Sequence, residues 1–116
     1  MISSKEAAKI AVDAMEEKKA EDIRIIEISE VSTIADYFII ANGNNVNQVH
    51  SISDFVEEQL AKSGIHPKQI EGYTNANWVL MDYGDLIIHI FDKENRLFYN
   101  LERIWRDGKQ IEKEEL

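Results

Sequence analysis

The chain has no cysteine and only one proline among its 116 residues. The lack of cysteine excludes disulfides and thiolate metal sites, and gives no sign of an oxidising compartment. A single proline argues against a disordered linker, and no apolar run approaches the roughly 20 residues that a membrane-spanning helix needs. The first residues lack the basic start and apolar run of a signal peptide. These absences predict a soluble, cytoplasmic protein.

Basic residues are scarce in the middle of the chain. The formal net charge is -9, and residues 21–92 hold twelve acids against only Arg24, Lys62 and Lys68, whereas both ends are neutral. Nucleic acids bind the opposite charge, because Lys and Arg displace counterions from phosphates. Direct, sequence-specific nucleic-acid binding is therefore not expected. A basic protein partner fits better, and solubility alone is the other explanation of the acidity.

Motifs for catalysis are also missing. There is neither a cysteine nor a G-x-S-x-G turn for nucleophilic catalysis. The asparagine-rich turn before the second predicted helix has one glycine and no P-loop pattern, so Asn44 or Asn45 as a helix cap explains it. Asp82, Asp85 and His89 do not converge as a metal site would require. We expect no enzyme, cofactor or metal. The alternative is a nucleotide-binding or nucleotidyltransferase-like enzyme that uses Asn44, Asn45, Asp82 and Asp85.

Local patterns predict helices and strands in alternation. A Ser-x-x-Glu capping box opens a helix from Ser3 to about Lys19, whose alanine-rich stripe favours close packing on a sheet. A second helix is expected over 46–62, ended by Gly64 and Pro67. The remaining elements are predicted strands at 22–28, 37–41 and 68–73, a hairpin within 77–91 and a short helix at 100–105.

These elements predict one α/β domain over residues 1–107. Its mixed sheet has about five strands, because the hairpin must be antiparallel, whereas 37–41 and 68–73 are joined through a helix and are expected to run parallel. Residues 108–116 are polar and are predicted to form a frayed tail.

The hairpin is apolar on both faces. Gly84 and Asp85 form a two-residue turn with glycine at the position that needs a positive φ. This register places one fully apolar face under the helices. The opposite face carries Trp78, Leu80, Asp82, Ile87, His89 and Phe91.

Two explanations of this second face remain open. Trp and Phe beside polar groups are typical of an interaction hot spot, so the face can bind another protein, with Tyr83 and Glu71 at its rim. Alternatively, the fold encloses the sheet on both sides. We take the six face residues with Tyr83 and Glu71 as the candidate partner-binding site.

Two stretches resemble a known family, the Iojap-related ribosomal silencing factors. They are DYFIIANG…QVHSISDFVEEQL and EGYTNANWVLMDYGDLIIHIFDKENRLFYNLERIW, and the resemblance covers residues 3–107. The specific string comprises Trp78, Asp82, Gly84, Asp85, His89, Phe91, Arg96, Tyr99, Leu101, Glu102 and Trp105. One departure lies in residues 43–48, where the family usually has a Gly-x-Ser turn and basic residues.

The resemblance implies a nucleotidyltransferase-like fold without the catalytic motif. It further implies a translation repressor that binds ribosomal protein fourteen of the large ribosomal subunit. Such a repressor sterically blocks joining of the small subunit and slows translation under nutrient limitation. A homodimer in the free state is also implied. A basic ribosomal protein agrees with the acidic composition of this chain.

Overall fold

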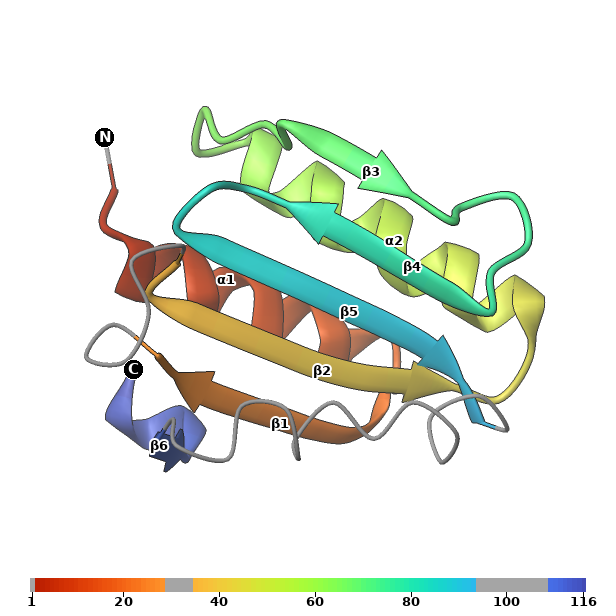
Figure 1. Cartoon of the computed structure of the whole chain (residues 1–116), viewed down its shortest axis with the longest axis horizontal. Coiled ribbons are helices and arrows are strands. Elements are labelled where there is room, and N and C mark those ends of the chain that lie inside the picture. Colours follow the sequence, from red (N-terminus) through yellow and green to blue (C-terminus); the bar gives the residue numbers. More distant parts are fainter. Residues whose placement is uncertain (1, 29–34, 94–108) are drawn as a thin grey trace.

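The computed structural model describes residues 2–28, 35–93 and 109–116 (Figure 1). Among these residues, six strands form one sheet in the order β3-β4-β5-β2-β1-β6. The strands are β1 (Glu21–Glu27), β2 (Tyr37–Gly43), β3 (Gln69–Glu71), β4 (Trp78–Asp82), β5 (Leu86–Asp92) and β6 (Lys109–Ile111). The helices are α1 (Ser4–Glu17), α2 (Val46–Ala61) and the short 3-10 helix η2 (Lys113–Glu115). The predicted mixed α/β sheet is confirmed.

Both long helices begin at the residues that the sequence predicts as caps. The Ser3 hydroxyl accepts a hydrogen bond from the Glu6 amide at 3.1 Å, and Asn45 Oδ1 accepts one from the Gln48 amide at 2.9 Å. Each bond satisfies one of the amides that a helix start leaves without a partner. Gly64 follows α2 with a φ of +79°, a left-handed conformation that glycine adopts without a Cβ clash.

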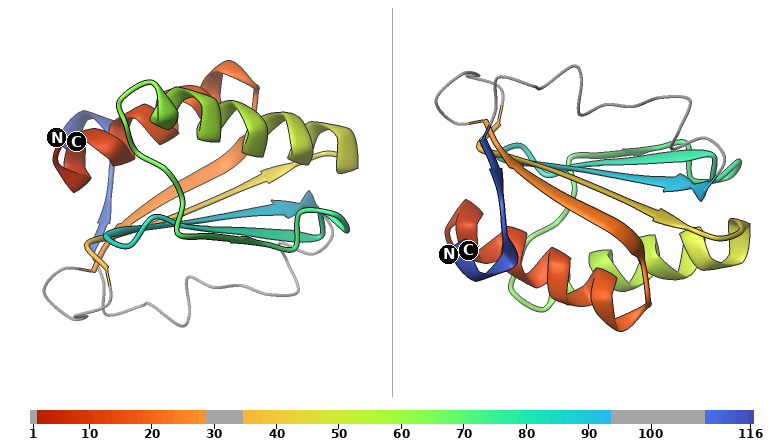
Figure 2. Two further views of the ribbon diagram at one scale, coloured as in Figure 1. Left: turned by 90° about the horizontal axis from the view of Figure 1, so that it is seen from above. Right: turned by 90° about the horizontal axis from the view of Figure 1, so that it is seen from below.

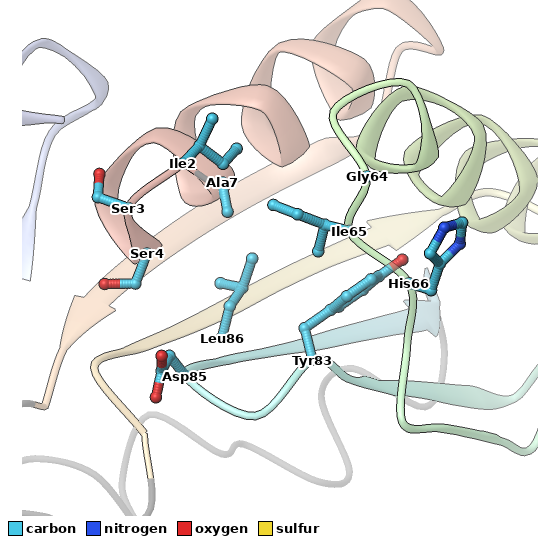
Figure 3. Close-up of a pocket in the computed structure, with 10 residues that line it drawn as sticks. All are labelled: Ile2, Ser3, Ser4, Ala7, Gly64, Ile65, His66, Tyr83, Asp85 and Leu86. Carbon is cyan, nitrogen blue, oxygen red and sulfur yellow. The ribbon is translucent and has the colours of Figure 1, made fainter.

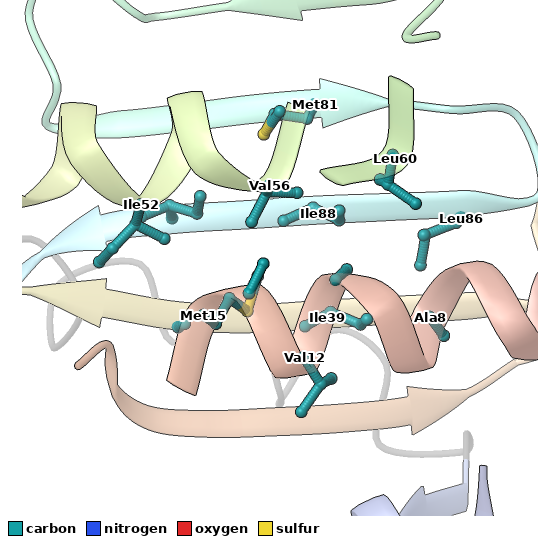
Figure 4. Close-up of a cluster of buried hydrophobic side chains, with 14 of the residues drawn as sticks. Ala8, Val12, Met15, Ile39, Ile52, Val56, Leu60, Met81, Leu86 and Ile88 are labelled. Atoms are coloured by element: carbon teal, nitrogen blue, oxygen red, sulfur yellow. The ribbon is translucent and has the colours of Figure 1, made fainter. Parts of the chain in front are cut away.

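The two long helices lie side by side on one face of the sheet, as both views in Figure 2 show. The main core lies between the helices and the sheet (Figure 4). It contains Met15 of α1 and Ile52 of α2, together with Ile39 of β2 and Ile88 of β5. Ala8 is fully buried there. Small side chains on α1 let this helix approach the sheet closely.

The hairpin has the predicted register. Trp78 pairs with Phe91 and Leu80 with His89 in antiparallel alignment, and the Tyr83 amide donates to the Leu86 carbonyl at 2.9 Å. Gly84 has a φ of +89°, as a turn with glycine at its first central position requires. The face under the helices is the fully apolar one.

The strands predicted at 37–41 and 68–73 run parallel to each other, as expected. β2 and β3 run in the same direction, but they are not neighbours, because β4 and β5 lie between them. β2 pairs in parallel with β5, and β3 pairs antiparallel with β4. The apolar β5 takes the buried central place, whereas the short, polar β3 lies at the edge.

The C-terminal residues correct the prediction of a frayed tail. β6 pairs antiparallel with β1, and Ile111 is only 8% exposed because it packs against the main core. The Lys113 ammonium lies 2.6 Å from carboxylate oxygens of both Asp13 and Glu16 on α1. One buried isoleucine therefore anchors a segment that is otherwise polar. The predicted helix at 100–105 lies outside the described residues, as do Arg96, Tyr99, Leu101, Glu102 and Trp105.

Candidate partner-binding site

The second face of the sheet carries the predicted site residues of β4 and β5. Alternation along the two strands places Trp78, Leu80 and Asp82 beside their partners Phe91, His89 and Ile87. In the described part of the chain, α1 and α2 both lie on the opposite face (Figure 2). The sequence thus predicted correctly which hairpin side chains share this face.

An aromatic stack forms the centre of this face. The rings of Trp78 and Phe91 are stacked with centroids 5.4 Å apart, and the His89 ring lies on that of Phe38 at 4.2 Å. The Trp78 indole Nε1 donates a hydrogen bond to His89 Nδ1 at 2.8 Å. Buried Trp side chains usually find such a partner for the indole N–H. The stack therefore joins β4, β5 and β2 through side chains as well as through backbone pairing.

His89 is held in its neutral form. Burial lowers its pKa to about 3, because a charged imidazole is disfavoured away from water. Since Nδ1 accepts from Trp78, the neutral ring carries its proton on Nε2. This Nε2 atom is buried and has no hydrogen-bond partner among residues 2–28, 35–93 and 109–116.

Burial corrects part of the predicted contact surface. Phe91 is 0% exposed and His89 is 4% exposed, so neither side chain is open to a partner. β5 lies in the middle of the sheet, and its side chains pack against those of its neighbours. A second cluster collects on this face from β1, β2 and β5, namely Ile26, Ile28, Ala35, Phe38, Ile40 and Phe91, with Trp78 and Ile87 packed against it. Enclosure of this part of the sheet was the alternative that the sequence left open.

Exposure on this face increases toward β3. Trp78, Leu80, Asp82 and Ile87 are half-buried, and Glu71 on β3 is exposed. Glu71 pairs with Leu80, so the two side chains share the second face. Asp82 Oδ1 accepts a hydrogen bond from the Gly84 amide at 2.8 Å, which fixes the turn. We call these five residues, Glu71, Trp78, Leu80, Asp82 and Ile87, the open edge.

Tyr83 does not lie at the rim of the open edge. It packs against the main core on the helix side and lines a pocket of about 270 Å³ between the start of α1, the hairpin turn and the residues after α2 (Figure 3). Its hydroxyl is buried without a hydrogen-bond partner in the described part of the chain. Burial, followed by the nearby charge of Glu57, raises the pKa of Tyr83. The alternation of side chains along the hairpin explains this placement on the opposite side of the sheet.

The residues of the enzyme alternative have structural positions. Asn45 caps α2, and the Asn44 amide donates to Gln48 Oε1 at 2.6 Å. Asp85 is an exposed turn residue whose carbonyl accepts from the amides of Asp36 and Tyr37. In the part of the chain that the structure describes, no three His, Asp or Glu side chains gather as a metal site would require. Nor is any helix there long and apolar enough to cross a bilayer.

One contact between α2 and the β3–β4 loop was missed at the sequence level. His50 stacks on the Tyr73 ring with centroids 4.3 Å apart, and the Tyr73 hydroxyl donates to both carboxylate oxygens of Asp54, at 2.9 and 3.1 Å. The spacing of four residues places His50 and Asp54 on one side of the helix. No local pattern shows that Tyr73, about twenty residues further on, docks against them.

Comparison with known proteins gives the family. The model of the RsfS family, described as "Ribosomal silencing factor during starvation", matches residues 1–116. The chain belongs to the RsfS family of ribosomal silencing factors. The chain is 42% identical over 107 residues to the ribosomal silencing factor RsfS of Bacillus subtilis, covering 92% of this chain and 91% of that protein. It is 33% identical over 108 residues to the chloroplastic protein Iojap of Arabidopsis thaliana, covering 92% of this chain but 43% of the plant protein.

Two solved structures have the same fold as this chain. A crystal structure from Bacillus halodurans superposes with a TM-score of 0.83 at 37% identity, covering 94% of this chain and 99% of the other. A crystal structure from Chromobacterium violaceum superposes with a TM-score of 0.87 at 28% identity, covering 96% of this chain and 92% of the other. The predicted family and the predicted fold class are both confirmed. The family model extends through residue 116, in agreement with the role of β6 in the sheet.

Proposed function

We propose that this RsfS-family chain represses translation by binding the large ribosomal subunit, in the cytoplasm, through ribosomal protein fourteen. The bound domain occupies space that the small subunit needs, so the two subunits do not join. Inhibition is steric and involves no bond formation or cleavage. Nutrient limitation is the condition in which the repression acts, in agreement with the family description "during starvation".

The observation that carries this proposal is the open edge of the sheet. Leu80 offers apolar area that is half-buried in the free chain, and Glu71 and Asp82 add negative charge beside it. A basic ribosomal protein is attracted to such an edge over a distance, whereas the phosphates of surrounding RNA are repelled. An interface of ordinary size buries about 800 Å² on each partner, so the open edge would form only its centre.

The first test uses purified ribosomal subunits. The wild-type chain should sediment with large subunits, and light scattering should show slower formation of joined ribosomes when small subunits are added afterwards. Addition after joining should have less effect, because the blocked surface is then occupied. Normal joining in the presence of saturating, subunit-bound protein would refute the steric mechanism while leaving the binding itself in place.

In the free state we propose a homodimer that uses the same open edge. β3 pairs on one side only with β4 among the described strands, and a sheet edge readily accepts a second copy. Dimer and large subunit would then compete for one surface. Sedimentation velocity over a range of protein concentrations tests this, since a Leu80→Lys variant should stay monomeric because the added charge opposes burial of this edge against a second copy.

A further inference from the structure

Two large apolar side chains are strongly exposed in the described part of the chain. They are Val46, at 44%, and Tyr73, at 38%. They belong to one region, because Val46 lies one helical turn before His50, and His50 stacks on Tyr73. We call Val46, His50 and Tyr73 the α2 patch. It lies on α2 and the β3–β4 loop, apart from the open edge.

Tyr73 is held in place before any partner arrives. Its hydroxyl donates to Asp54, and its carbonyl lies 2.6 Å from His50 Nε2. The loop around it is tight, since Gly72 has a φ of +76° and its carbonyl accepts from the Ala76 amide at 3.0 Å. An exposed tyrosine that is already ordered loses little conformational entropy on binding, and tyrosine is enriched at binding hot spots.

The surroundings of the α2 patch favour a cationic partner. A hollow of about 370 Å³ borders it, lined in part by His50, Asp54, Phe55 and Glu58. Lys18 already places its ammonium 4.8 Å from the centre of the Phe55 ring. Lys18 also lines this hollow, so a positive charge over an aromatic ring is an arrangement that this surface supports within the chain itself.

We propose that the α2 patch docks an arginine-bearing segment of a basic protein. Arginine fits better than lysine, because a planar guanidinium can stack on the face of the Tyr73 ring that His50 does not cover while it pairs with the Asp54 carboxylate. Nucleic acid is disfavoured by the same carboxylates. The inference rests on the proposed function in one respect: the proposed function identifies this basic protein as a component of the large ribosomal subunit. The patch then provides a second contact beside the open edge.

The test compares variants of the full chain in binding to purified large subunits. Tyr73→Ala should weaken binding by about tenfold, as loss of an aromatic anchor does, while Tyr73→Phe retains the ring and most of the affinity. Val46→Lys should also weaken binding, and Ser63→Lys, which adds the same charge at the other end of α2, should not. Thermal unfolding of each variant checks that the fold is retained. Unchanged binding by folded Tyr73→Ala and Val46→Lys would overturn the proposal.

A second measurement separates this inference from the proposed function. The isotope-labelled chain is titrated with the peptide acetyl-Gly-Arg-Gly-Arg-Gly-amide and with its lysine counterpart, and amide shifts are followed by NMR. The arginine peptide should shift the α2 patch more strongly than the lysine peptide, and Tyr73→Ala should remove the effect. If the wild type fails to bind large subunits, the proposed function and that partner fall, whereas these shifts still support the patch. Shifts spread over all acidic surfaces would refute the patch.

Discussion

At the scale of the residue, His89 links the aromatic stack to pH. Its pKa is lowered to about 3 by burial, whereas an unfolded chain has a histidine pKa near 6.5. Between these values the unfolded chain binds a proton that the native chain does not, so the free energy of unfolding falls as the pH falls through this window. The stability contributed by the neutral ring is fully present above the unfolded pKa.

The pH prediction can be measured by urea unfolding at pH 7 and pH 5. The wild type should lose about 2 kcal/mol more than His89→Gln between these two conditions. If His89→Gln and the wild type lose the same stability on acidification, the imidazole is not held neutral by the fold.

Two glycines with similar φ provide a matched pair for backbone geometry. Gly64 has a φ of +79° and nothing within 4 Å of an added Cβ, whereas Gly72 has a φ of +76° and would place that Cβ 2.1 Å from the Trp78 carbonyl oxygen. Gly64→Ala should therefore cost about 1 kcal/mol from φ alone. Gly72→Ala should cost about 3 kcal/mol or more, because the loop must also move away from β4. Equal losses in chemical denaturation would contradict the close approach.

At the scale of the element, β6 depends on one apolar residue. Ile111 is buried against the main core, while Lys113 is an exposed cation between two carboxylates. Ile111→Ala should cost about 2–4 kcal/mol, as truncation of a buried isoleucine does, and Lys113→Ala should have the smaller effect, since surface ion pairs contribute little. Urea denaturation compares the two. A larger loss for Lys113→Ala would mean that charge, not packing, anchors β6.

The elements also show what the sequence could and could not predict. Capping residues, apolar periodicity and the Gly84 turn are local signals, and they located both helices and the hairpin register correctly. β6 was missed because three mostly polar residues carry no strand pattern of their own and gain order only by pairing with β1. The order of the strands depends on pairing between distant segments, so the neighbours of β3 could not be read from the residues around it.

At the scale of the whole molecule, the two faces of the sheet have different roles. Helices α1 and α2 close one face, and on the other face burial decreases from β2 toward β3. The sequence predicted which side chains occupy the second face but not how far each is exposed. Exposure depends on neighbours from β1 and β2, such as Ile26 and Phe38, which lie far from the hairpin in sequence. The candidate site is therefore smaller than predicted and lies nearer the β3 edge.

Trp78→Ala is a poor probe of binding for this reason. Trp78 is half-buried, stacks on Phe91 and donates to His89, so its removal should disturb the stack and lower stability. Glu71 is exposed, and a charge reversal there changes the open edge with little effect on the core. Glu17, exposed on α1, allows the same change of charge at a site away from the sheet.

The most direct test of the open edge measures the affinity of Glu71→Lys, Leu80→Ala and Glu17→Lys for purified large ribosomal subunits. Glu71→Lys and Leu80→Ala should each weaken binding by about tenfold, whereas Glu17→Lys should stay within about twofold of the wild type. Circular dichroism confirms that each variant is folded. Wild-type affinity in both edge variants, or an equal loss in Glu17→Lys, would contradict binding through this edge.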